Sequence, residues 1–108
     1  METYLFICGS GEYRSPAAAR IALDLLREHE VDGIATDFVG LIDYETARQK
    51  INSASRIFVM ERQIAELIGE IRNFSGRIDC LDIPKGLSYH QKALEDKLRE
   101  VLPRVLFN

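Results

Sequence analysis

The chain contains little of what several kinds of protein require. Its only two cysteines, Cys8 and Cys80, lie far apart in the sequence, which argues against a scaffold held together by disulfides. Together with two histidines, His29 and His90, they form no recognisable cluster of metal ligands, so we expect neither a metal nor another cofactor. No stretch approaches the roughly 18 apolar residues that suggest a membrane span. A net charge of −3 offers no basic surface for nucleic acid.

The sequence also lacks a recognisable targeting segment, linkers and internal repeats. Glu2 stands where the basic start of a signal peptide would be, and we therefore expect a cytoplasmic protein with no membrane partner. A length of 108 residues with 46% apolar content indicates a single domain, residues 1–108. We expect this domain to be a monomer or a weak homodimer.

Strand-like and helix-like segments alternate along the chain. Apolar runs predict strands at 3–8, 31–38, 56–60 and 77–82, with Gly33 interrupting the second. Helical spacing predicts helices at 16–29, 44–52, 61–73 and 88–105. On the first helix we expect Ala18, Ile21, Ala22, Leu25 and Leu26 to face inward. On the third helix the inward positions are Ile64, Leu67, Ile68 and Ile71, and on the last helix they are Ala93, Leu94, Leu98, Val101 and Leu102.

This alternation predicts an α/β fold with a four-stranded parallel sheet in the flavodoxin-like order 2-1-3-4. Right-handed crossovers place helices on both faces of such a sheet, which gives a three-layer sandwich. Ligands bind outside the carboxyl ends of the strands, at the switch point beside the first strand. Cys8, Glu61 and Asp82 stand at or just after strand ends. We therefore expect these three residues at the same edge of the sheet.

The most specific feature is the segment from Cys8 to Ser15, which reads CGSGEYRS and lies between an apolar strand and a helix. Ser15 and Pro16 are typical of the N-cap and the first position of a helix. The glycines allow the loop to turn sharply and to point its N–H groups inward. A dianion held there would meet those N–H groups, the helix dipole and the guanidinium of Arg14. The same positive field favours the thiolate form of Cys8.

Strand, C-x5-R-S, proline and helix in this order resemble the phosphate loop of the low-molecular-weight protein tyrosine phosphatases. The segment SRIFVME at 55–61 is similar to the central strand of that family and the turn after it. The segment LDIP at 81–84 is similar to its last strand, which leads to the acid loop. With 108 residues, the chain looks most like the compact branch of predicted tyrosine phosphatases.

The resemblance implies a role for each residue of the loop. Cys8 would be the nucleophile that forms a phosphocysteine, and Arg14 would bind two phosphoryl oxygens. Ser15 would donate a hydrogen bond to the thiolate. Asp82, the carboxylate nearest to the acid loop, would protonate the leaving group. The substrate-binding cradle would consist of Gly9, Ser10, Gly11, Glu12, Tyr13, Arg14 and Ser15.

The sequence departs from the pattern of that family at several positions. Gly11 stands where the family usually has an asparagine that helps to fix the loop. Glu12 adds a carboxylate, which opposes dianion binding unless its side chain points outward. In our alignment the acid-loop aspartate of the family falls on Lys85, which could attract an anionic substrate or pair with the loop carboxylate, and its aromatic residue falls on Leu87. Either Asp82 acts as the proton donor in a shifted loop, or no residue does.

Five further residues have weaker assignments. Tyr13 stands where some members of the family carry a protective second cysteine, and it either stacks on an aryl substrate or packs against a neighbouring loop. Tyr89 is a candidate for the missing acid-loop aromatic. We expect Glu61 and Ser88 to cap the third and the last helix. Cys80 is expected to be a buried strand residue.

These residues predict a cysteine-dependent phosphomonoesterase. A phosphotyrosine protein, a small aryl phosphate and a phosphorylated metabolite all fit the loop. One alternative is a pseudo-phosphatase that binds a phosphorylated or anionic partner without turnover. Another is a phosphoryl carrier like the B domains of sugar phosphotransferase systems, against which Arg14 argues. A third is an arsenate-reductase-like role, for which Cys80 is a poor second cysteine.

Overall fold

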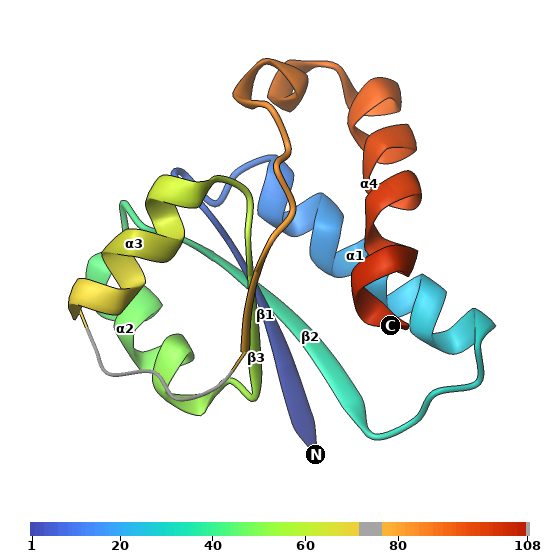
Figure 1. Ribbon diagram of the computed structural model, residues 1–108, viewed down its shortest axis with the longest axis horizontal. Helices are drawn as coiled ribbons and strands as arrows, with labels where there is room; N and C mark the ends of the chain where they lie inside the picture. The colour runs from blue at the N-terminus through green and yellow to red at the C-terminus, as the bar shows by residue number, and fades with distance from the viewer. Residues whose placement is uncertain (72–76, 108) are drawn as a thin grey trace.

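The computed structural model describes residues 1–71 and 77–107, and strands alternate with helices as the sequence predicts (Figure 1). The described strands are β1 (Glu2–Cys8), β2 (Ile34–Gly40), β3 (Arg56–Val59) and β4 (Arg77–Cys80). The described helices are α1 (Arg14–Glu28), α2 (Tyr44–Ser53), α3 (Arg62–Ile71), the 3-10 helix η1 (Lys85–Tyr89) and α4 (Gln91–Leu106). None of these described helices is both long and apolar enough to cross a bilayer.

The strands form one parallel sheet in the order β2-β1-β3-β4, which confirms the predicted topology. β1 pairs with β2 along its whole length, from Glu2 opposite Ile34 to Cys8 opposite Gly40. Because β1 lies between β2 and β3, the chain crosses to opposite sides of it in successive crossovers. The carboxyl end of β1 is therefore the switch point of the sheet, and Cys8 lies there.

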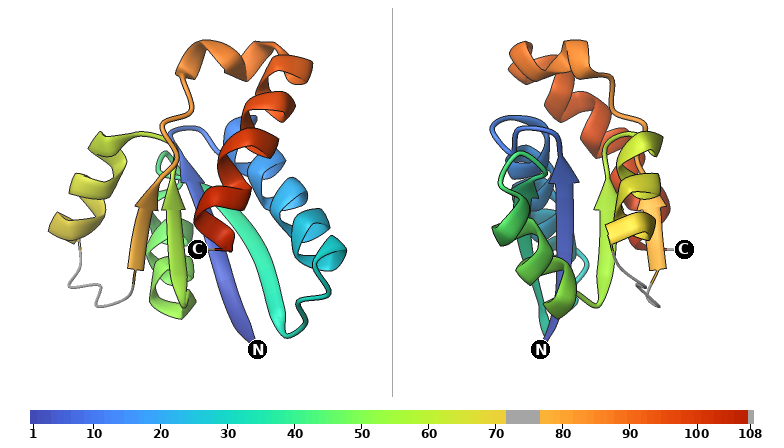
Figure 2. Two further views of the ribbon diagram at one scale, coloured as in Figure 1. Left: turned by 45° about the vertical axis from the view of Figure 1, so that its right-hand side comes forward. Right: turned by 90° about the vertical axis from the view of Figure 1, so that its left-hand side faces the viewer.

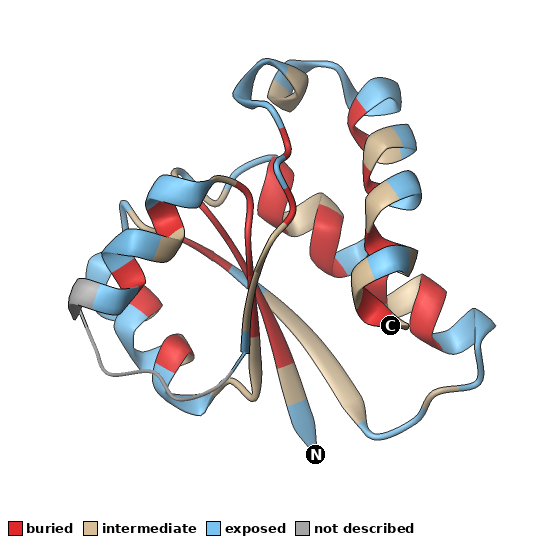
Figure 3. Cartoon of the chain, in the orientation of Figure 1, coloured by how far each residue is buried: buried red, intermediate tan, exposed pale blue. Residues whose placement is uncertain are grey.

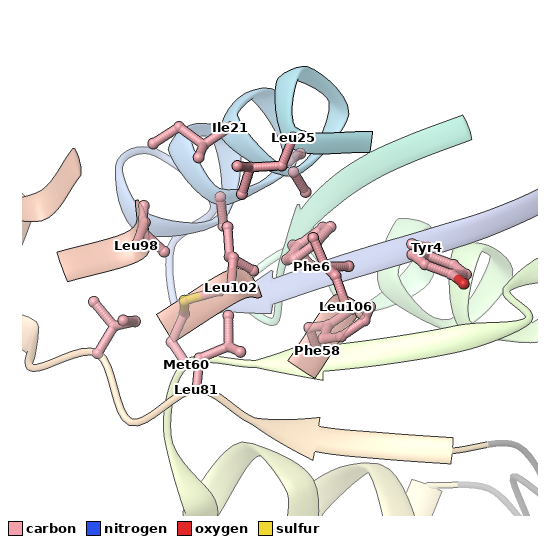
Figure 4. Packing of buried hydrophobic residues seen from close by; sticks show 14 of the residues in the cluster. Tyr4, Phe6, Ile21, Leu25, Phe58, Met60, Leu81, Leu98, Leu102 and Leu106 are labelled. Atoms are coloured by element: carbon pink, nitrogen blue, oxygen red, sulfur yellow. The ribbon is translucent and has the colours of Figure 1, made fainter. Parts of the chain in front are cut away.

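The sheet is covered by helices on both faces (Figure 2). Tyr4 and Phe6 of β1 and Phe58 of β3 pack with α1 and α4 on one face (Figure 4), and the rings of Phe6 and Phe58 are stacked with their centroids 4.7 Å apart. Leu5 and Ile7 pack with α2 and α3 on the other face. Successive strand side chains point to opposite faces, so the continuous apolar run of β1 serves both cores. The three-layer arrangement predicted from the sequence is confirmed.

Buried residues lie on the sides of the helices that face the sheet (Figure 3). All the inward positions predicted on α1 are buried. On α3 and α4 the buried stripe is narrower than predicted: Leu67 is 45% exposed and Ala93 is exposed. Leu67 and Ala93 directly precede the buried residues Ile68 and Leu94. Because one step along a helix rotates the side-chain direction by about 100°, the preceding side chain points away from the core. The side chain of Ile71 and the predicted helix end at 73 lie outside the described residues.

Several predicted boundaries differ from the structure by a few residues, and three of these differences have local reasons. Gly33 has a φ of 81°, a left-handed conformation that suits glycine, and β2 begins only after it. Asp82 has a φ of 52°, so β4 ends before it. The predicted N-cap at Ser88 is wrong, because this residue lies in η1 and α4 begins at Gln91.

Candidate active site

The loop between β1 and α1 is anchored on the chain that follows β2. Cys8 ends β1 and is 2% exposed. The carbonyl oxygens of Cys8 and Gly9 accept hydrogen bonds of 3.0 Å from the N–H groups of Leu41 and Ile42. These bonds turn both carbonyls toward β2. The N–H of Gly11 is left for the opposite side, where the sulfur of Cys8 lies.

The sulfur of Cys8 has two hydrogen-bonding neighbours. The N–H of Gly11 donates to Sγ at 3.1 Å, and the Ser15 hydroxyl oxygen lies 3.1 Å from the same atom. Ser15 is not the N-cap that we predicted, because α1 begins two residues earlier than expected, at Arg14, and its N-cap, Tyr13, makes no side-chain capping bond. Ser15 is fully buried in the first turn, and its hydroxyl contacts the sulfur. The positive end of the α1 dipole also lies at this loop.

Gly11 lies directly against Gly40, the last residue of β2. Gly11 has a φ of 75°, and a Cβ built on it would lie 2.6 Å from the backbone nitrogen of Gly40. A Cβ on Gly40 would lie 2.2 Å from the carbonyl carbon of Ser10. Contacts below about 3 Å between such atoms do not occur in folded proteins, so only two facing glycines allow this approach. Backbone packing thus holds the loop at the position where the resemblance led us to expect an asparagine.

Arg14 is buried and held from two sides. Its side chain is 3% exposed, Nη1 donates to the carbonyl oxygen of Ile83 at 2.8 Å, and Nη2 pairs with Oε1 of Glu61 at 2.7 Å. A guanidinium has five N–H donors, so these two bonds leave others for a ligand. Glu61 directly precedes α3, at the position where we expected a cap, and its carboxylate pairs with Arg14. Ile83 reaches Arg14 because its N–H continues the strand ladder to the carbonyl of Met60 at 3.0 Å.

A pocket of about 330 Å³ opens above the loop. Glu12 and Lys85 contribute one charge of each sign to its wall, and neither forms an ion pair with another described residue. The rings of Tyr13 and Tyr89 meet edge to face with their centroids 5.2 Å apart. The wall consists of Cys8, Gly9, Ser10, Glu12, Tyr13, Arg14, Ile42, Lys85, Ser88 and Tyr89.

Asp82 lies in a different pocket. It lines a neighbouring space together with Glu61 and Lys85, and its Oδ1 accepts a hydrogen bond of 3.3 Å from the Cys80 thiol. Asp82 follows β4, and β3 separates β4 from β1 in the sheet. The structure therefore brings Cys8, Arg14 and Ser15 together but leaves Asp82 outside the pocket that contains Cys8.

The two cysteines lie on opposite faces of the sheet. Cys8 belongs to the core with α1 and α4, and Cys80 packs against the core with α2 and α3. Both are free thiols. Burial raises the pKa of the Cys80 thiol, which disfavours its nucleophilic form. This placement removes the basis for a redox partnership between Cys8 and Cys80.

Sequence reasoning placed Glu61 at the correct edge of the sheet but missed its contact with Arg14, and it missed Gly40 altogether. Glu61 and Gly40 each stand at the carboxyl end of a strand neighbouring β1. That position was the available signal, because strand ends of a parallel sheet converge at the switch point. Position at a strand end therefore indicates which few residues lie near the loop, but it does not predict the contacts that they make.

The geometry can be compared with that of solved structures. The arginine phosphatase of Drosophila is similar to this chain with a TM-score of 0.73 and 15% identity, over 99% of this chain and 96% of that one. A protein tyrosine phosphatase from Entamoeba histolytica is similar with a TM-score of 0.71 and 14% sequence identity, over 99% of this chain and 98% of that one. A low-molecular-weight protein tyrosine phosphatase from Bacillus subtilis is similar with a TM-score of 0.65 and 14% sequence identity, over 98% of each chain.

Neither a protein-family model nor the sequence of a curated protein matches the chain. The likeness lies in the fold, since the sequence identities to the solved structures are low. The fold predicted from the loop motif and the order of elements is confirmed: the chain has the fold of the low-molecular-weight protein tyrosine phosphatases.

The contact between Gly11 and Gly40 predicts different effects of two alanine substitutions in one loop. Gly11→Ala places a Cβ against β2 in a left-handed conformation, which costs about 1–3 kcal/mol. Gly9→Ala is the control, because a Cβ at Gly9 meets no atom within 4 Å. Urea unfolding should show a clear loss of stability for Gly11→Ala alone. Equal stability of the two variants would contradict the close packing described above.

Proposed function

We propose that the chain is a cysteine-dependent phosphatase whose substrate phosphate binds in the loop between Cys8 and Ser15. One observation carries the proposal. The sulfur of Cys8 accepts a hydrogen bond from the Gly11 N–H and contacts the Ser15 hydroxyl at the start of α1, beside the buried Arg14. Hydrogen-bond donors and a helix N-terminus stabilise a thiolate, and the same groups bind the oxygens of a phosphoryl group.

The proposed reaction has two steps. The Cys8 thiolate attacks phosphorus, an S–P bond forms, and the bond from phosphorus to the ester oxygen breaks as that oxygen takes a proton from water and leaves as the alcohol. Water then attacks the phosphocysteine, the S–P bond breaks, and inorganic phosphate and the thiolate are released. In both steps negative charge spreads over the equatorial oxygens, where loop N–H groups and the remaining N–H donors of Arg14 stabilise it.

The pair between Arg14 and Glu61 supports this reaction by fixing the guanidinium. A free arginine side chain occupies many rotamers, and holding it in one geometry before the substrate arrives lowers the barrier. Two of its nitrogens are anchored by Glu61 and by the carbonyl of Ile83. We assign Glu61 the role of a positioning residue for Arg14.

A second candidate function is phosphate or phosphoprotein binding without turnover. The observation in its favour is that Lys85, rather than a carboxylate of the acid loop, lines the pocket with Cys8. Such a pocket binds an anion well and offers no aspartate to protonate a poor leaving group. The carrier and reductase alternatives have less support, since Arg14 is buried at the loop and Cys80 lies on the far face of the sheet.

The two cysteines provide the direct test of the proposed function. Cys8→Ser is expected to abolish hydrolysis of p-nitrophenyl phosphate, because a serine hydroxyl is a far weaker nucleophile than a thiolate. Cys80→Ser is the control and should keep turnover. Steady-state rates from pH 5 to 8 provide the measurement. If the wild type releases no phosphate at any pH but still binds vanadate, the non-catalytic alternative is correct.

Glu61 provides a test of the positioning role. Glu61→Ala frees one side of Arg14, and misplacement of a catalytic group by about 1 Å reduces rates by about 10²-fold. Glu61→Gln retains an acceptor oxygen and should recover part of the loss in kcat. Glu45→Gln, on the exposed surface of α2, is the matched control. If kcat for Glu61→Ala equals that of the wild type, Arg14 needs no support from Glu61.

The placement of Asp82 makes a further prediction. Asp82→Asn should leave turnover of both p-nitrophenyl phosphate and phenyl phosphate unchanged, because its carboxylate does not line the pocket with Cys8. A general acid contributes about 10²–10⁴-fold, most strongly for the poorer leaving group. Asp96→Asn on the exposed face of α4 serves as the control. A selective loss on phenyl phosphate would restore the role that the sequence suggested for Asp82.

A further inference from the structure

A second pocket adjoins the one that contains Cys8. It has a volume of about 430 Å³, within the range of pockets that bind ligands in proteins. Helices α1 and α4 pack against each other on one face of the sheet (Figures 1 and 2). The second pocket lies between the first turns of α1 and the junction of η1 with α4. Its wall consists of Glu12, Tyr13, Pro16, Ala17, Arg20, Ser88, Tyr89, Gln91 and Leu94.

The two pockets share part of their wall. Glu12, Tyr13, Ser88 and Tyr89 line both of them. The rings of Tyr13 and Tyr89, 42% and 77% exposed, stand between the two spaces. A molecule whose phosphoryl group is bound at Cys8 therefore passes the two rings when it extends toward α4.

The chemistry of the second pocket differs from that of the first. Pro16, Ala17 and the buried Leu94 give it an apolar inner wall. Its one cation, Arg20, is paired with Glu95 at 3.2 Å, and Glu12 adds a negative charge at the border with the first pocket. The charges of Glu12, Arg20 and Glu95 together are net negative, which disfavours a second phosphate here. An apolar side chain, by contrast, is stabilised here by the surface that it buries against this wall.

We propose that the second pocket binds an apolar side chain adjacent to the phosphorylated residue of a polypeptide substrate. The proposal rests on the proposed function, because the phosphoryl group is taken to bind at Cys8. Neighbouring Cα atoms are about 3.8 Å apart, so a residue next to the phosphorylated one enters the adjoining space while the phosphoryl group remains in the loop. Glu12 at the border disfavours an acidic residue at the same position. A small aryl phosphate fills the first pocket alone.

The test compares phosphotyrosine peptides that carry leucine, serine or aspartate on either side of the phosphotyrosine. For the wild type, kcat/KM should be about tenfold higher with leucine than with serine on one side, and lowest with aspartate. Ala17→Glu places a charge in the apolar wall and should reduce the ratio of leucine to serine to about one. Ala93→Glu makes the same change at an exposed position of α4 and should keep the ratio. Because each ratio is measured within one variant, changes in overall activity cancel.

The outcomes separate this proposal from the function on which it rests. If p-nitrophenyl phosphate is hydrolysed but the peptides are hydrolysed with equal kcat/KM, the proposed role of the second pocket is wrong and the proposed function stands. Absence of all turnover overturns the proposed function. The ratio of the affinities of the leucine and serine peptides for the wild type then tests the second pocket in place of the ratio of kcat/KM. A dimer in sedimentation velocity that Ala17→Glu dissociates would identify a second copy of the chain as the occupant and overturn the proposal.

Discussion

The close approach of Gly11 to Gly40 is the constraint on which the arrangement of the site depends. It allows the loop after β1 to lie directly on the end of β2, where Leu41 and Ile42 bind the loop carbonyls. With the carbonyls turned to β2, the Gly11 N–H points at the sulfur of Cys8. A side chain at either glycine would separate the loop from the sheet. The site is thus built by backbone packing between adjacent parallel strands.

The charges of the site follow from this construction. Arg14 is neutralised in part by Glu61, and the pocket wall carries Glu12 and Lys85 with opposite signs. Under the proposed function, the positive potential at the loop comes from the Gly11 N–H and the α1 dipole together with Lys85. Arg14 would then contribute directional hydrogen bonds from a fixed position. This division would let a loop with its own carboxylate bind an anion.

Sequence reasoning was successful where the information is local. Periodicity gave the order of the elements and the sheet, and the segment from Cys8 to Ser15 gave the loop, because both depend on neighbours in the chain. It failed where two local roles compete. Ser15 is of a residue type that caps helices, but its hydroxyl contacts the Cys8 sulfur. Glu61, which follows the neighbouring strand β3 and is far from Arg14 in the sequence, pairs with that arginine. Whether Asp82 would lie beside Cys8 could not be predicted either, since its position depends on how the chain turns after β4.

The central claim is that Cys8 becomes covalently phosphorylated during turnover. The most direct measurement is acid quenching of the wild type during hydrolysis of p-nitrophenyl phosphate, followed by mass spectrometry of the peptides that contain Cys8 and Cys80. The account predicts the added mass of one phosphoryl group on the Cys8 peptide and none on the Cys80 peptide. Turnover with both peptides unmodified at every quench time, or with the phosphoryl group on another residue, would contradict it.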